Sequence, residues 1–231
     1  MTKQTKNMKN AMRSVALAGL CLLPQASLKA EGLEDVKLTG NVAYFMAGSA
    51  NSGAQTTYPE LNHSLTLPYN TRVSGFFDFY QGDNGYFGKT VVEKGLTDRL
   101  NARVNIEHIN EPFSRAGFGL SYSLPTPKGT FAKISYLPMY INKEGEKVDN
   151  RQVVGFAAGA ELPADFSVLA FAEVNVAARK GVQWGYGEVE LAKKFGEDKR
   201  FSVGLNLQLN NQGAGNPVPE VVPRAVVRVG F

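Results

Sequence analysis

The chain has 231 residues with a formal net charge of +4, 43% hydrophobic residues, 24 glycines and one cysteine. This composition excludes a collagen-like repeat, a disulfide-stabilised scaffold and a disordered chain, and no run of about 18 apolar residues predicts a transmembrane helix. Five of the 25 basic residues fall among the first 30 positions, where no acidic residue occurs. The rest of the chain carries 20 basic and 21 acidic residues, so its charge gives no argument for a nucleic-acid partner.

The first 30 residues have the three parts of an export signal. A basic stretch extends to Arg13, an apolar run follows from Val15 to Leu23, and small residues come next. Because the apolar run is too short to span a bilayer as a helix, we predict a cleavable signal peptide over residues 1–30. Cleavage is expected after Ala30, with Ala26 as the alternative.

The single cysteine, Cys21, lies in this leader. It follows Ala18-Gly19-Leu20, which resembles the lipid-attachment signal of bacterial lipoproteins but has a bulky leucine where that signal has a small residue. We therefore interpret Cys21 as an apolar residue of the signal peptide. Residues 31–231 then hold no thiol for a disulfide or a metal site.

From residue 36 onward, apolar and polar residues alternate in segments of about ten residues that are separated by turn residues. Successive side chains of a strand point to opposite faces, so such a segment has one apolar and one polar face. In the clearest case Leu100 and Val104 share one face, whereas Arg103 and Asn105 share the other. On this basis we predict twelve strands, over residues 36–46, 58–67, 72–80, 86–94, 98–108, 115–125, 129–142, 152–162, 166–178, 183–194, 201–210 and 221–231.

The lengths of these segments favour a membrane barrel over a soluble sheet. Nearly all have at least the roughly 9–11 residues that a tilted strand needs to cross a bilayer, and no segment has a helical period that could cover the apolar faces. Short connections alternate with longer ones, as expected for periplasmic turns and outer loops. The segments at 58–67 and 86–94 are the weakest predictions, and ten strands remain the alternative because ten is also even. Pro138 predicts a bulge or an early strand end.

The last segment carries the most specific pattern. Phe231 is preceded at every second position by Val229, Val227 and Ala225. This ending resembles that of bacterial outer-membrane β-barrel proteins, among them small porin-like barrels of about twelve strands. The resemblance implies an all-β fold, a single antiparallel up-and-down transmembrane barrel over residues 31–231. It also implies export to the bacterial outer membrane, periplasmic termini, contact with outer-membrane lipids, and recognition of these four residues by the barrel-assembly machinery.

The polar face of each strand must point into a closed barrel, because a charged side chain on the lipid face at mid-membrane costs roughly 2–4 kcal/mol. The predicted interior, with Lys89 and Glu93 included, holds six basic and seven acidic side chains. Strong selection of anionic solutes would require a lining of one sign, so the mixed interior argues against it. The residues that we predict to line the lumen are Asp78, Tyr80, Arg99, Arg103, Glu107, Lys133, Glu161, Glu173, Trp184, Tyr186, Glu188, Glu190, Arg224 and Arg228.

Two functions compete for this interior. In one, paired charges fill the lumen and the barrel is structural, since buried charges persist when they are paired and hydrogen-bonded. In the other, the barrel is a narrow channel for small, neutral solutes, because twelve strands lie between filled barrels of about eight strands and open pores of sixteen or more. A ring-bearing solute such as a nucleoside or sugar would suit the aromatic and polar groups of Phe76, Asp78, Tyr80, Trp184 and Tyr186.

An outer-membrane lipid-modifying hydrolase is the third hypothesis, because barrels that resemble this one in size include such enzymes. Catalysis would need a histidine beside a serine or an acid, and only His63 and His108 are present. A rim triad of His108, Glu107 and Ser114 is conceivable, but adjacent strand residues face opposite ways. We therefore expect a channel and not an enzyme. The sequence shows no cofactor motif, metal-ligand cluster or nucleic-acid stripe, and its pattern does not identify the solute.

Overall fold

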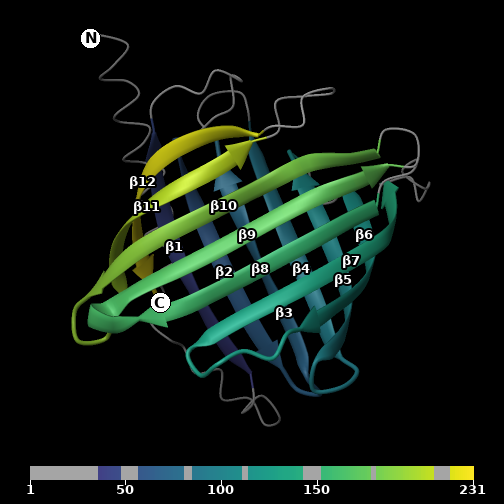
Figure 1. The fold of residues 1–231 in the computed structure, drawn as a ribbon, viewed down its shortest axis with the longest axis horizontal. Helices are drawn as coiled ribbons and strands as arrows, with labels where there is room; N and C mark the ends of the chain where they lie inside the picture. Colours follow the sequence, from purple (N-terminus) through teal and green to yellow (C-terminus); the bar gives the residue numbers. More distant parts are fainter. Residues whose placement is uncertain are drawn as a thin grey trace.

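Twelve antiparallel strands, each hydrogen-bonded to its neighbours in the chain, form a closed barrel in which β1 also pairs with β12 (Figure 1). The computed structural model describes residues 36–47, 57–80, 85–110, 114–142, 152–177, 181–210 and 219–231. Its strands are β1 (Lys37–Ala47), β2 (Tyr58–Leu67), β3 (Thr71–Phe79), β4 (Tyr86–Gly95), β5 (Leu100–Ile109), β6 (Arg115–Ser123), β7 (Thr130–Asn142), β8 (Gln152–Leu162), β9 (Phe166–Ala177), β10 (Gly181–Phe195), β11 (Phe201–Asn210) and β12 (Glu220–Gly230).

The prediction of twelve strands is confirmed, and β2 and β4, the weakest predictions, are both present. A short 3-10 helix, η2 (Pro163–Asp165), connects β8 to β9. No helix in the described ranges is long and apolar enough to span a membrane. The predicted signal peptide over residues 1–30 and most of the predicted outer loops lie outside the described residues.

The outer wall of the barrel is apolar, because the exposed faces of the strands carry mostly apolar side chains. On β11, Val203, Leu205 and Leu207 are exposed, whereas Asn206 and Gln208 on the opposite face are buried. Leu205 pairs in register with exposed residues of β10 and β12, so the apolar surface continues from strand to strand. Such a continuous apolar wall is suited to a lipid environment and not to water.

Replacing Leu205 with arginine is expected to destabilise the barrel by roughly 2–4 kcal/mol, the cost of a charge on the lipid face at the bilayer midplane. Leu205 is the midpoint residue of β11 and is 69% exposed. Urea unfolding in lipid vesicles, followed by the fluorescence of the only tryptophan, Trp184, measures this loss. Glu197→Arg, in the exposed turn after β10, is the matched control and should change stability by less than about 0.5 kcal/mol. Equal stabilities of both variants would contradict a lipid-facing wall.

The pairing of β6 with β7 is interrupted by a bulge. Phe118 pairs with Met139 and Leu120 with Tyr136, so β7 has one more residue than β6 between these pairs. The extra residue comes at Pro138, which cannot donate a ladder hydrogen bond. The bulge predicted at this proline is therefore confirmed.

The short connections and both described ends of the barrel lie at one end of the molecule. Gly40 and Phe231 exchange two backbone hydrogen bonds of 3.2 and 2.9 Å, which place the carboxyl terminus beside the start of β1. In the turns at this end, the Lys199 ammonium lies 2.6 Å from the Asp165 carboxylate. This contact lowers the pKa of Asp165 below its ordinary value. We refer to this end as the turn end and to the opposite end as the loop end.

Candidate functional site: the charged lumen

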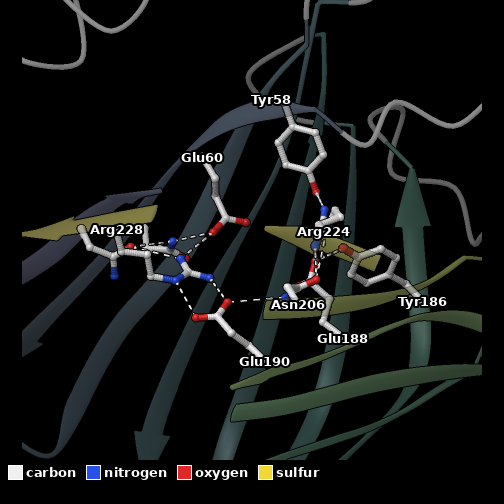
Figure 2. Close-up of polar contacts among 10 residues, drawn as sticks. Tyr58, Glu60, Tyr186, Glu188, Glu190, Asn206, Arg224 and Arg228 are labelled. Carbon is white, nitrogen blue, oxygen red and sulfur yellow. Dashed lines mark hydrogen bonds and ion pairs between the residues drawn. The ribbon is translucent and has the colours of Figure 1, made fainter. Parts of the chain in front are cut away.

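Arg224 of β12 is the most enclosed charge of the lumen, with 0% of its side chain exposed. Figure 2 shows its guanidinium beside Tyr58, Glu188 and Asn206. Nη2 lies 2.6 Å from a carboxylate oxygen of Glu188, and Nη1 donates a 2.6 Å hydrogen bond to the hydroxyl of Tyr58. Nε donates to the side-chain oxygen of Asn206 at 3.0 Å, and the Phe45 ring lies 4.0 Å away. The charge is therefore buried with its donors satisfied, which is the condition under which a buried ion pair is tolerated.

Arg228, four residues further along β12 and on the same face, forms a second centre of the same network (Figure 2). Its Nη2 lies 2.6 Å from Glu190, and its Nη1 lies 3.2 Å from Glu60 on β2. Asn206 connects the two centres, since its amide donates to Glu188 at 3.0 Å and to Glu190 at 3.5 Å. The network therefore fixes β2, β10, β11 and β12 to one another through side chains inside the lumen.

Two further groups of charges reach across the lumen. Lys89 of β4 lies 2.5 Å from Glu173 of β9, and these strands are nearly opposite in the ring. Glu93, also on β4, binds Lys133 of β7 at 2.6 Å and Arg103 of β5 at 3.4 Å. These contacts narrow the path along the barrel axis.

Free space in the lumen is largest at the turn end. A cavity of about 680 Å³ there is lined in part by Asn41, Asn62, Glu190, Lys194 and Arg228. A cavity of about 180 Å³ lies beside Lys89 and Glu173. Between Arg103, Lys133 and Glu173 the space is only about 20 Å³, close to the minimum that one water molecule needs. The lumen is thus a wide vestibule followed by a constriction.

The structure places most of the predicted lumen charges on the inner face. Every carboxylate of that predicted set except Asp78 has a cationic partner, in the pairs Glu107–Arg115, Glu161–Lys194, Glu173–Lys89, Glu188–Arg224 and Glu190–Arg228. Asp78 is buried opposite Glu60, and its Oδ1 has no hydrogen-bond partner among the described residues. Tyr80 packs on Tyr58 with ring centroids 5.4 Å apart. Tyr186 donates a short hydrogen bond to Glu188.

Three predicted lumen residues lie elsewhere or at the margin. Glu161 is at the turn-end rim with 61% of its side chain exposed, and Arg99 is in the exposed turn before β5. Trp184 pairs with Val174, whereas Tyr186 pairs with Glu173, because a bulge at Gly185 adds one residue to β10. Val174 and Glu173 are adjacent and face opposite ways, so Trp184 lies on the outer wall. The prediction that Trp184 lines the lumen was wrong, because it assumed unbroken alternation across Gly185, where the bulge reverses the direction of the side chains.

The sequence prediction omitted Tyr58, Glu60 and Asn206, which are central to the lumen network. Glu60 and Tyr58 were missed because β2 has polar residues on both faces and gave a weak strand pattern. Asn206 occupies the polar phase of a well-predicted strand. Its position in the same alternation as the buried Gln208 could have identified it.

Both histidines lie on the outer wall. The His63 ring stacks on Phe77 at 5.7 Å, and the same phenyl ring lies 5.3 Å from His108. Nε2 of His108 is 3.1 Å from the hydroxyl of Thr90. Glu107, by contrast, points into the lumen and lies 3.0 Å from Arg115. The acid of the conceivable rim triad is therefore on the opposite face of the strand from His108. No group of three or more potential metal ligands occurs among the described residues.

The closed barrel, apolar outside and polar inside, defines the architectural class of the chain: a twelve-stranded up-and-down β-barrel. Two solved structures share this fold, the KdgM porin and the NanC porin. Each has a TM-score of 0.54 and covers 84% of this chain and 99% of its own, at sequence identities of 11% and 13%. No protein-family model and no curated protein sequence matches the chain. The likeness confirms the predicted porin-like barrel at the level of the fold.

Proposed function

We propose that the protein is a bacterial outer-membrane channel for small solutes without net charge. The observation that carries this proposal is the combination of an apolar outer wall with a polar, charge-paired lumen that holds a vestibule of about 680 Å³. An apolar wall of closed strands is the form in which β-structure crosses a membrane. The porin fold of the two similar structures supports the same function.

The pairing of the lumen charges supports a preference for neutral solutes. Glu93, Glu173 and Glu190 each have a cationic partner within 2.6 Å. A solute with a net charge would leave one charge of the narrow lumen without a counter-charge, which is costly where water is scarce. A neutral solute with hydrogen-bonding groups would leave the pairs intact.

The orientation in the membrane follows from the connections. Short turns face the periplasm in barrels of this kind, so we propose a periplasmic turn end with both chain ends there. Export through the inner membrane by means of residues 1–30 belongs to the same proposal. Ala225 and Val229 on the exposed face of β12 fit the proposed assembly signal with Val227 and Phe231, for recognition by the barrel-assembly machinery.

Planar-bilayer recordings of the purified, refolded barrel test the proposed channel. Discrete openings of small conductance with little preference between cations and anions are expected, because the lumen is narrow and its charges are paired. A refolding mixture of detergent and lipid without protein is the control. Strong selection of one ion sign would contradict the proposed neutral solute, and complete silence would contradict the channel.

A side-chain-filled structural barrel is the second candidate function. The 2.5 Å contact between Lys89 and Glu173 favours it, because this pair crosses the lumen and both side chains are about nine-tenths buried. The two candidates differ in what happens when this contact is removed. A channel gains conductance, whereas a filled barrel remains silent.

A further inference from the structure

The cavity of about 180 Å³ lies on the lumen side of β3, β4, β9 and β10. Its lining includes four aromatic side chains, whereas the lining of the vestibule at the turn end includes two, Phe131 and Phe231. Lys89 and Glu173, the pair that crosses the lumen, form its polar margin. The aromatic residues that line it are Phe76, Phe87, Phe171 and Tyr186.

These aromatic side chains form two pairs from opposite parts of the ring. Phe76 of β3 and Phe87 of β4 have centroids 5.8 Å apart, and Phe171 of β9 and Tyr186 of β10 have centroids 6.2 Å apart. Lys89 reaches from the first pair to the second, since its Nζ lies 5.8 Å from the Phe171 ring. Aromatic rings at such separations bind a further ring by stacking or by edge-to-face contact.

The bulge at Gly185 borders the cavity and shapes its wall. A Cβ atom at this position would lie 2.8 Å from the backbone oxygen of Glu173 and 3.0 Å from the side-chain amide nitrogen of Asn175. Only glycine therefore fits there without displacing the backbone of β9. The bulge also separates Tyr186, which faces the cavity, from Trp184 on the outer wall. Bulges are common where a side chain is re-aimed toward a functional site.

The charged groups around the cavity are already paired. Lys89 lies 2.5 Å from Glu173, and Arg115 lies 3.0 Å from Glu107. A ligand with a net charge would compete with one partner and leave the other unbalanced in a confined space. A ligand that is neutral overall can hydrogen-bond to these groups and keep both pairs.

We propose that this cavity is a binding site for a net-neutral solute that carries one aromatic ring. Its volume matches a single ring, since an apolar cavity of about 150 Å³ is sufficient for benzene. The inference rests on the proposed function in one respect, because the channel is the route by which the solute reaches the cavity. The site selects the ring by aromatic contact and rejects net charge through its paired lysine, arginine and carboxylates.

Isothermal titration of the folded barrel in detergent with L-phenylalanine tests the site. This probe has one ring and no net charge, whereas 3-phenylpropionate is an anion and L-cyclohexylalanine has a saturated ring. We expect L-phenylalanine to bind. L-cyclohexylalanine should bind about tenfold more weakly because it lacks the aromatic contacts, and 3-phenylpropionate about tenfold more weakly because its net charge unbalances the ion pairs. Absence of L-phenylalanine binding, or equal binding of either comparison probe, would overturn the proposal.

Phe171→Leu removes one aromatic face of the cavity and should weaken L-phenylalanine binding about tenfold. Phe201→Leu is the matched control, because Phe201 lies on the outer wall, on the same face of β11 as Val203, and is 42% exposed. Equal weakening by both variants would overturn the site. Failure of the site leaves the bilayer conductance unchanged, whereas failure of the channel leaves titration intact, so the two proposals are separated by these readouts.

Discussion

Replacing Lys89 with alanine is expected to raise the single-channel conductance several-fold and to shift ion preference toward cations. Lys89 is the positive end of the contact that crosses the lumen from β4 to β9. Without its side chain, the cavity of about 180 Å³ and the narrow space of about 20 Å³ gain a common opening, because Glu173 lines both. The carboxylate of Glu173 then remains without its partner and attracts cations.

The opposite end of the same contact provides an internal test. Glu173→Gln removes the negative charge and leaves Lys89 in the lumen, so ion preference should shift toward anions. Lys94→Ala is the matched control, because Lys94 is on the same strand but is exposed near the turn end, where its ammonium binds the backbone oxygen of Tyr69. Bilayer recordings of the three variants distinguish the models. If Lys89→Ala and Glu173→Gln conduct as the unaltered protein does, the contact is not the constriction.

The strand positions could be predicted because a membrane strand imposes a strict period of two on the sequence. The predicted segment 201–210 matches β11, and 152–162 matches β8. The lumen-facing residues of β11 could be predicted in the same way, since Asn206 and Gln208 alternate with exposed leucines. Alternation depends only on consecutive residues, so it can be recognised in one segment without knowing how the rest of the chain folds.

Which face of a strand each side chain occupies could not be predicted where a bulge left no signal in the sequence. The bulge at Pro138 could be predicted, because proline cannot donate a ladder hydrogen bond. Gly185 gave no such signal, since glycine also occurs in regular strands, and Trp184 and Tyr186 were placed on one face although the bulge separates them. One inserted residue reverses every earlier side chain of the strand.

The ion pairs within the lumen could not be predicted from the sequence either. Lys89 and Glu173 are separated by 84 positions, and their contact depends on the closure of the ring and on strand tilt. Alternation predicts that both side chains point inward, but it gives no height along the barrel axis. Most of the lumen charges could therefore be predicted, although Glu60 was missed and Arg99 was misplaced, whereas the constriction that they form could not.

Replacing Arg224 with methionine is expected to destabilise the folded barrel by about 3–5 kcal/mol, the usual cost of removing one partner of a buried ion pair. Methionine keeps much of the side-chain volume, so lost packing contributes little. The variant leaves Glu188 without its counter-charge and deprives the Tyr58 hydroxyl and the Asn206 oxygen of a donor. Urea unfolding in lipid vesicles measures the loss of stability.

The size of this loss identifies its cause when two further variants are compared. Arg200→Met removes an exposed arginine that pairs with Asp198 in a turn, and it should cost no more than about 1 kcal/mol. The double variant Arg224→Met with Glu188→Met removes both charges of the buried pair and should recover a substantial part of the stability. Recovery arises because the unpaired carboxylate, more than the missing arginine contacts, destabilises the single variant. A double variant as unstable as the sum of its single variants would show that Arg224 stabilises the barrel through Tyr58, Asn206 and Phe45 instead.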